Sequence, residues 1–180
     1  MNYSIKKFPF SRMRRLRMKP FIRNLVSENS ISCNDLIWPV FLVEGENQNQ
    51  KIKSMPFVYR YSIDKLIKEL EILVKYGLQA VALFPQIEKD LKDERGTNSY
   101  DQNNLICRAI KEIKSSYPDL GIIADIALDP FTIHGHDGII KNNKIANDET
   151  IAVLKKQALV FLLENLIFFF KVFLIFIEKH

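Results

Sequence analysis

Short apolar runs alternate along this chain with segments in which apolar residues recur at a helical spacing. The continuous runs predict buried strands at residues 36–43, 80–84 and 122–127, the first of them buried on both faces. Apolar residues three and four positions apart predict helices at residues 62–77, 105–117 and 147–158. Strands that alternate with helices over short connections indicate parallel βα units. The pattern therefore predicts an α/β fold, and both a (β/α)8 barrel and a doubly wound sheet fit it.

Residues at the ends of these elements support the predicted boundaries. Capping and stop signals stand at Ser62, Gly77, Pro118 and Asn147. Pro39 interrupts the first strand, and because proline has no N–H to donate, we expect a bend, a bulge or an edge position there. The polar residues 48–61 predict a loop, and the polar residues 88–103 predict a mobile loop that forms a lid or a subunit contact.

The amino-terminal segment differs in charge from the rest of the chain. Its first 23 residues hold eight basic residues and no acidic ones, whereas the remainder holds 18 basic and 21 acidic residues. The formal net charge of +5 therefore belongs to this segment. Pro9 and Pro20 argue against a long regular helix, so we predict an extended arm over residues 1–30. Basic residues with interleaved aromatics suit nucleic acid or an acidic protein surface, and we favour the protein surface.

The carboxyl-terminal segment differs in hydropathy. Residues 161–177 contain six phenylalanines and no Gly, Pro, Ser or Thr. A membrane span needs about 20 mostly apolar residues, but Glu164 and Lys171 would lie inside this one, at roughly 2.5–3.5 kcal/mol each near the bilayer centre. We therefore predict that residues 160–180 are a tail of unrelated sequence, of the kind that a frameshift produces. A membrane anchor is the alternative. Residues 31–159 then form the α/β domain.

The two cysteines and the amino terminus indicate a reducing compartment. Cys33 and Cys107 lack the paired spacing of a zinc site or a disulfide framework, so we expect buried or incidental thiols. No apolar stretch follows the first positive charges, which argues against a secretory signal. These features predict a cytoplasmic protein.

The candidate chemistry lies in and after the third apolar run. Asp125 interrupts that run, and the following loop carries Asp129, His134, His136 and Asp137. In parallel α/β proteins the carboxyl ends of strands and the loops after them face the ligand. The alternative is that Asp129 begins an ordinary turn with Pro130 and that the histidines are solvated.

Residues 125–138 read Asp-Ile-Ala-Leu-Asp-Pro-Phe-Thr-Ile-His-Gly-His-Asp-Gly, which resembles the signature loop of the porphobilinogen synthase (5-aminolevulinate dehydratase) family. The resemblance extends in the right order through residues 12–17, 35–45, 54–56, 80–85 and 147–159. It stops at Val160. It implies the first three to four βα units of a (β/α)8 TIM barrel, without the second half, in which the family carries its Schiff-base lysines.

The resemblance also implies a function. The family condenses two molecules of 5-aminolevulinate to porphobilinogen in tetrapyrrole and haem biosynthesis, through lysine Schiff bases and with no organic cofactor. It implies a cytoplasmic lyase in which the basic arm embraces a neighbouring subunit of a homo-octamer, with no nucleic-acid or membrane partner. Because the lysines are absent, we expect the chain to be inactive alone. The alternative is a non-catalytic protein held at a membrane by its tail, with the arm on acidic lipid or nucleic acid.

The resemblance sets the expected metal. In one branch of the family the signature loop carries three cysteines for a catalytic zinc, and those positions are Ala127, Asp129 and Asp137 here. Carboxylates are hard oxygen donors, so we expect Mg²⁺ or a monovalent cation at Asp129 and Asp137 rather than zinc.

The three acidic residues of this segment are the catalytic candidates. Asp125, Asp129 and Asp137 are expected to position a substrate amine, order a metal-bound water or relay protons, and close carboxylates share a raised pKa. Which role belongs to which residue stays open. His134 and His136 are second-rank candidates, and Ile133 departs from the small polar residue that the family has at that position.

Overall fold

The computed structural model describes residues 9, 14–164 and 168–170 of the chain, which divides into two compact units, Met1–Ser32 and Cys33–His180. In the first unit, a 3-10 turn, η1 (Arg15–Arg17), precedes a short helix, α1 (Pro20–Leu25). Pro20 occupies the first turn of α1, where proline is tolerated because its missing N–H has no helical partner. The predicted extended arm thus contains two short helical turns, and no long helix forms in its described residues.

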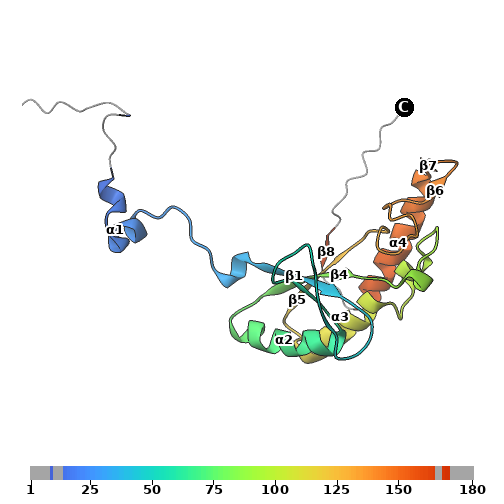
Figure 1. Cartoon of the computed structure of the whole chain (residues 1–180), viewed down its shortest axis with the longest axis horizontal. Helices are drawn as coiled ribbons and strands as arrows, with labels where there is room; N and C mark the ends of the chain where they lie inside the picture. The colour runs from blue at the N-terminus through green and yellow to red at the C-terminus, as the bar shows by residue number, and fades with distance from the viewer. Residues whose placement is uncertain (1–8, 10–13, 165–167, 171–180) are drawn as a thin grey trace, which may run out of the picture. The chain divides into compact units, whose positions relative to one another are not determined.

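The second unit is built on a sheet with the strand order β2-β3-β1-β4-β5-β8 (Figure 1). Strands β1 (Ile37–Leu42), β4 (Ala80–Pro85) and β5 (Gly121–Asp125) confirm the three predicted strands. They are parallel, with Leu42 beside Pro85 and Leu83 beside Ala124. Their carboxyl ends therefore meet at one edge of the sheet.

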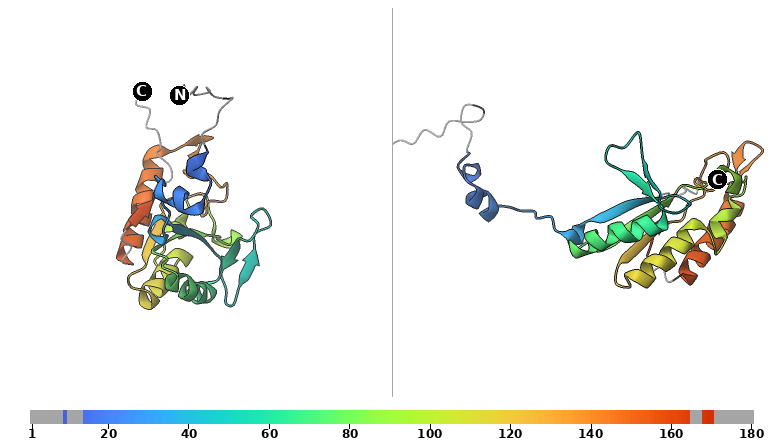
Figure 2. Two further views of the ribbon diagram at one scale, coloured as in Figure 1. Left: turned by 90° about the vertical axis from the view of Figure 1, so that its left-hand side faces the viewer. Right: turned by 60° about the horizontal axis from the view of Figure 1, so that its bottom comes forward.

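One face of these strands forms the core. Every second residue is fully buried, namely Val40, Leu42, Val81, Leu83, Ile122 and Ala124. The residues between them are more exposed than this set, and Ile37 and Pro39 of β1 are exposed to solvent, so the prediction that the first strand is buried on both faces is wrong. The reason is that α2 and α3 lie against the same face of the sheet, and no helix among the described residues of the second unit covers the opposite face (Figures 1 and 2).

The three predicted helices are present as α2 (Ile63–Lys75), α3 (Leu105–Ser116) and α4 (Asn147–Leu163). Asn104 caps α3 by accepting a hydrogen bond from the Cys107 N–H at 2.9 Å. Ser62 precedes α2 as predicted, but its hydroxyl accepts from the Gln48 N–H instead of capping the helix. The cap residue of α4 is Ala146, so Asn147 begins that helix rather than capping it.

The predicted loop at residues 48–61 is instead a hairpin. It contains β2 (Asn49–Lys51) and β3 (Tyr59–Tyr61), which pair antiparallel, and it rises from the sheet in teal in Figure 2. Strands of three residues are too short to show a two-residue period, which is why the pattern missed them. Strand β3 runs parallel to β1 but pairs with it only at Phe41 and Leu42. Pro39 therefore has a strand on one side only among the described residues, which confirms the predicted edge position.

The polar stretch after β4 has an ordered internal structure. It forms two 3-10 turns, η3 (Lys89–Leu91) and η4 (Thr97–Tyr100). The Asp93 carboxylate accepts hydrogen bonds from the backbone N–H groups of Arg95 at 2.9 Å and Thr97 at 3.0 Å. A second hairpin, β6 (Ile140–Lys141) with β7 (Lys144–Ile145), connects the loop after β5 to α4.

The predicted boundary of the tail falls inside an element. Helix α4 continues to Leu163, and β8 (Phe168–Phe170) pairs parallel with β5, so that Phe169 lies beside Ala124. Residues 165–167 and 171–180 lie outside the described part of the chain. Among the described helices, none is both long and apolar enough to cross a membrane.

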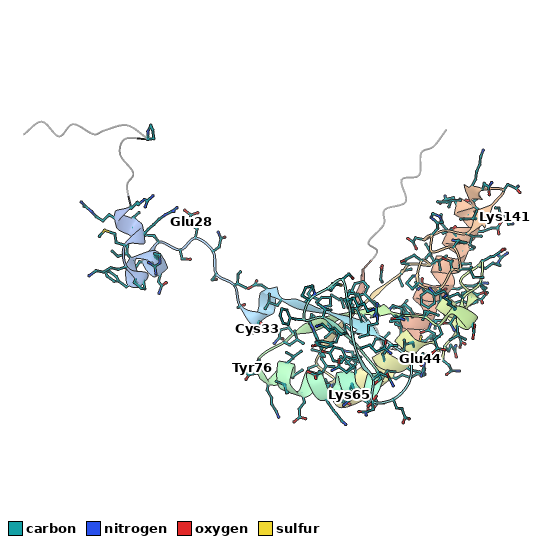
Figure 3. The ribbon with its side chains drawn as sticks, viewed as in Figure 1. Glu28, Cys33, Glu44, Lys65, Tyr76 and Lys141 are labelled. Carbon is teal, nitrogen blue, oxygen red and sulfur yellow. The ribbon has the colours of Figure 1, made fainter. Side chains whose placement is uncertain are left out.

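The two cysteines are free thiols and form no disulfide. Cys33 is exposed beside the end of α2, where its thiol donates to the Tyr76 carbonyl at 3.1 Å (Figure 3). Cys107 is buried in α3, and burial, with the negative charge of Glu164, raises the pKa of its thiol to about 12. Cys107 is thus a buried thiol and Cys33 an incidental exposed one, which are the two kinds that were predicted.

The tip of the β2–β3 hairpin tests the backbone account of this fold. Val58 N–H donates to the Met55 carbonyl at 3.2 Å, which closes a turn with Pro56 second and Phe57 third. Phe57 has φ of 65° and is 91% exposed, so its ring contributes little burial while its backbone occupies a region that favours glycine. We predict that Phe57→Gly stabilises the chain by about 1 kcal/mol, a rise of roughly 2–4 °C in the midpoint of thermal unfolding. Phe57→Ala is the control, since it removes the ring but keeps the strain, and an equal gain from both would contradict the account.

Candidate active site

A pocket of about 460 Å³ lies at the carboxyl ends of the three central strands. Strand β1 contributes Phe41 to its lining, β4 contributes Leu83, Phe84 and Pro85, and β5 contributes Asp125. The two phenylalanine rings lie with their centroids 5.7 Å apart. Phe41, Phe84 and Asp125 belong to the partly buried set on the face opposite the core, so the alternation that builds the core also places one apolar wall and one carboxylate in the pocket.

The loop after β5 completes the acidic side of the pocket. Asp129 lines it together with Ala127, so two of the three predicted carboxylates, Asp125 and Asp129, meet there. Asp137 does not line the pocket, and its carboxylate accepts a hydrogen bond from the Leu128 N–H at 2.5 Å. The structure thus gives Asp137 a contact with the backbone beside Asp129.

The pKa of Asp129 is raised above its ordinary value. Burial by the surrounding protein is the larger cause, and the negative charge of Asp137 is the second. The Asp129 backbone N–H and the positive charge of Lys92 act in the opposite direction but do not cancel the rise. A carboxyl group in this position keeps its proton to a higher pH than a solvated aspartate.

The two histidines hold the backbone of the loop. His134 accepts a hydrogen bond from the His136 N–H at 3.1 Å through Nδ1, and the ring centroids lie 5.5 Å apart. Thr132 donates from its hydroxyl to the His136 carbonyl at 2.9 Å. Neither histidine lines the pocket, whereas Gly135 between them does. Their second rank among the candidates stays a prediction.

Lys92 is a pocket residue that sequence reasoning missed. It comes from the stretch after β4 and lines the same pocket as Asp129, whose pKa its positive charge acts to lower. The neighbouring Asp93 fixes it there, since the Ile133 N–H donates to the Asp93 carbonyl at 3.1 Å and the Asp93 N–H to the Phe131 carbonyl at 3.3 Å. This pairing joins two segments about 40 residues apart, and no local pattern in a polar stretch indicates it.

The described residues contain no group of three His, Cys, Asp or Glu side chains that could hold a metal ion. Neither Cys33 nor Cys107 lines the pocket. The acidic side chains that do line it offer only oxygen donors, which is the donor type of a Mg²⁺ site held by one or two carboxylates and water.

The sequence and the fold of this chain were compared with those of known proteins. The delta-aminolevulinic acid dehydratase family profile matches residues 10–162. The delta-aminolevulinic acid dehydratase of Bradyrhizobium diazoefficiens is 47% identical over 149 residues, which cover 83% of this chain and 42% of that protein. The enzyme of Chlamydia pneumoniae is 49% identical over 142 residues, which cover 79% of this chain and 43% of that protein.

A solved structure agrees with both. The Toxoplasma gondii delta-aminolevulinic acid dehydratase (porphobilinogen synthase), in complex with the reaction product porphobilinogen, matches with a TM-score of 0.83 and 37% identity. The match covers 88% of this chain and 46% of that one. The chain belongs to the delta-aminolevulinic acid dehydratase family.

Family membership confirms the resemblance of residues 125–138 and the predicted fold class. The sheet and its helices are part of a (β/α)8 barrel, with three βα units followed by the parallel strand β8. The chain spans about half the length of the curated relatives it matches. Residues after 162 lie outside the family match.

The raised pKa of Asp129 predicts how stability depends on pH. A carboxyl group whose pKa is higher in the folded chain than in the unfolded chain opposes folding when it ionises. The resulting loss of folding stability is absent below the pKa of the unfolded chain, about 3.9, and complete above the pKa of the folded chain. Asp129→Asn should therefore raise the midpoint of thermal unfolding at pH 7 and leave it unchanged near pH 3.

Asp119→Asn is the matched control for this substitution, because Asp119 is exposed at the opposite end of β5. It should change the midpoint equally at both pH values. A midpoint for Asp129→Asn that is lower at pH 7 than that of the unsubstituted chain would contradict the assigned pKa.

Proposed function

We propose that this chain supplies the amino-terminal half of a porphobilinogen synthase barrel, the half that presents the acidic side of the substrate pocket. The observation that carries the proposal is the meeting of Asp125 and Asp129 with two phenylalanine rings at the carboxyl ends of β1, β4 and β5. In (β/α)8 enzymes the catalytic groups come from this end of the strands. The proposed reaction is the condensation of two 5-aminolevulinate molecules to porphobilinogen.

The pocket residues suit the proton transfers of such a condensation. Asp129, with its raised pKa, is the proposed proton carrier, because an acid whose pKa is closer to the working pH gives and takes a proton more readily. Asp125 is the proposed anchor for the ammonium group of a substrate, since it lies on the rigid end of β5. Phe41 and Phe84 provide an apolar wall for the methylene groups.

The covalent step of the family does not belong to this part of the barrel. Porphobilinogen synthases hold substrate through lysine Schiff bases, and the resemblance places those lysines in the second half of the family fold. Lys92 is the one lysine that lines the described pocket. Helix α4 carries Lys155 and Lys156, both exposed to solvent. We therefore propose that this chain alone does not catalyse the condensation.

The proposed metal is Mg²⁺ or a monovalent cation. Asp129 and, with a shift of its carboxylate away from Leu128, Asp137 are the residues that would hold it, and Ala127 removes the third donor of a cysteine set. The charge of such a cation would offset that of the two carboxylates and favour their ionised forms, so the proton-carrying role proposed for Asp129 belongs to the cation-free pocket. Oxygen donors of this kind do not compete well for zinc against a thiolate site.

The proposed assembly uses the arm. Leu25 and Ile31 in the first unit are about 80% exposed, and no acidic residue accompanies the basic ones before residue 28. An apolar and basic segment of this kind suits a neighbouring subunit with an acidic surface. The proposal is self-association into the family octamer in the cytoplasm.

A chimera tests the proposed function. Residues 10–162 should replace the segment that they match in the Bradyrhizobium diazoefficiens enzyme, and the product should convert 5-aminolevulinate to porphobilinogen. Asp125→Asn in this chimera should lower kcat/KM by about 100-fold or more, as loss of a catalytic carboxylate does. Asp119→Asn at the other end of the strand is the control. A folded chimera without activity, or one indifferent to Asp125→Asn, contradicts the proposal.

The same chimera tests the metal. Its activity should survive a zinc-selective chelator and should depend on Mg²⁺ or a monovalent cation. The control is the chimera with Ala127→Cys, Asp129→Cys and Asp137→Cys, which restores a thiolate set and should bind zinc. Stoichiometric zinc in the unsubstituted loop would contradict the assignment.

Trapping with borohydride tests the inactivity of the chain alone. Incubation of the 180-residue chain with 5-aminolevulinate and borohydride should leave no stoichiometric adduct, while the chimera, which carries the second half of the relative, should retain one. Mass spectrometry locates any modified residue. A single modified lysine in the chain, with Lys92 the first to inspect, together with pyrrole formation would overturn the prediction.

A further inference from the structure

The peptide unit between Ala127 and Leu128 is held by side chains at both of its polar atoms. Its carbonyl oxygen, on Ala127, accepts a hydrogen bond from Nε2 of Gln157 at 3.1 Å. Its N–H, on Leu128, donates to Oδ1 of Asp137 at 2.5 Å. Because a peptide unit is planar and rigid, two contacts of this kind fix the rotation of the whole plane. The next residue along the chain is Asp129.

Gln157 is an unusual residue for its position. It lies on α4 with no exposed surface, and the residues one turn before and after it, Val153 and Phe161, are apolar and buried. A buried amide costs free energy unless it is hydrogen-bonded. The chemistry of the amide fixes its orientation, since only the NH₂ group can donate to a carbonyl.

The contact with Ala127 accounts for this residue. Among the residues described, Oε1 of Gln157 has no hydrogen-bond partner, so the bond to the Ala127 carbonyl is the one that offsets the burial of the amide. An apolar side chain would fill the same space without leaving an acceptor unpaired. The free-energy cost of burying the unpaired Oε1 is therefore offset by the hydrogen bond that holds the Ala127 carbonyl in position.

We infer that Gln157 is a positioning residue that, together with Asp137, clamps the Ala127–Leu128 peptide unit and thereby sets the position of Asp129 in the pocket. The catalytic meaning of the clamp rests on the proposed function, but the clamp itself is a property of the folded chain. The inference also gives Asp137 a role in the fold, that of an acceptor for the Leu128 N–H. That role differs from the one expected of it as a metal ligand.

The backbone amides beside the clamp separate a clamp from ordinary packing. When the bond from Gln157 is lost, the Ala127–Leu128 peptide unit is held at its N–H alone, so the surroundings of the Leu128 and Asp129 amides should change. The readout is the amide resonances of Leu128 and Asp129, followed by NMR in the isotope-labelled full chain. Gln157→Met keeps the length of the side chain and removes the donor.

Gln157→Met should shift the amide resonances of Leu128 and Asp129 away from those of the unsubstituted chain, because it removes the donor to the Ala127 carbonyl. Val153→Ala is the matched control, since it removes buried methyl groups from the same helix and leaves both bonds of the clamp in place. It should destabilise the chain but leave these two resonances unchanged. Unchanged resonances in Gln157→Met, or an equal shift in Val153→Ala, would overturn the inference.

Gln157→Glu provides a second test that also serves if Gln157→Met does not fold. The new carboxyl group can donate to the Ala127 carbonyl when it is protonated and not when it is ionised. The Leu128 amide resonance should therefore match the unsubstituted chain at low pH and depart from it as the pH rises. A resonance that differs at every pH, or that never departs, would count against the clamp. Neither readout requires activity, so an inactive chimera beside a shifted Leu128 amide in Gln157→Met would refute only the proposed function.

Discussion

The rest of the structure depends on the burial of one face of three parallel strands. Leu42, Leu83 and Ile122 are almost completely buried against α2 and α3, and each such side chain stabilises the fold by about 1.5–3 kcal/mol. A register slip of one residue would turn this whole set to the other face. Since a domain is stable by only about 5–15 kcal/mol, such a slip is excluded. The register in turn brings the carboxyl ends of β1, β4 and β5 to one edge.

The pocket is a consequence of the same alternation. Residues between the core positions point away from the helices, so that Phe41, Phe84 and Asp125 meet at the edge where the strands end. The backbone beyond β5 then needs its own support, which Gln157 and Asp137 give to the Ala127–Leu128 peptide unit. Core packing places the strands, and buried polar contacts place the loop that carries Asp129.

Sequence patterns predicted the elements whose signals are local. The three strands and three helices showed their periods, and the resemblance of residues 125–138 identified the family and brought attention to Asp125 and Asp129. The hairpin of β2 and β3 was missed because its strands are too short for a period to appear. The placement of Lys92 was missed for another reason, since it depends on the bridge between Asp93 and Thr132.

The position of Asp137 shows the limit of reasoning from a motif. Its spacing and its family position suggested a carboxylate in the pocket, and the structure instead directs it to the Leu128 N–H. Gln157 had no signal at all, because a glutamine on a helix is ordinary until its burial and its partner 30 residues away are known. Tertiary hydrogen bonds of this kind cannot be deduced from periodicity.

Amide hydrogen exchange of the full chain tests the dependence on the central strands most directly. Strand β4 lies between β1 and β5, so the account predicts that its amides, with those of Val81 and Leu83 at the core, are the most protected. The amides of β2, at the end of the sheet and with an exposed surface, should exchange fastest among the strands. If β4 exchanged as fast as β2, one-sided burial of the central strands could not be what holds the pocket together.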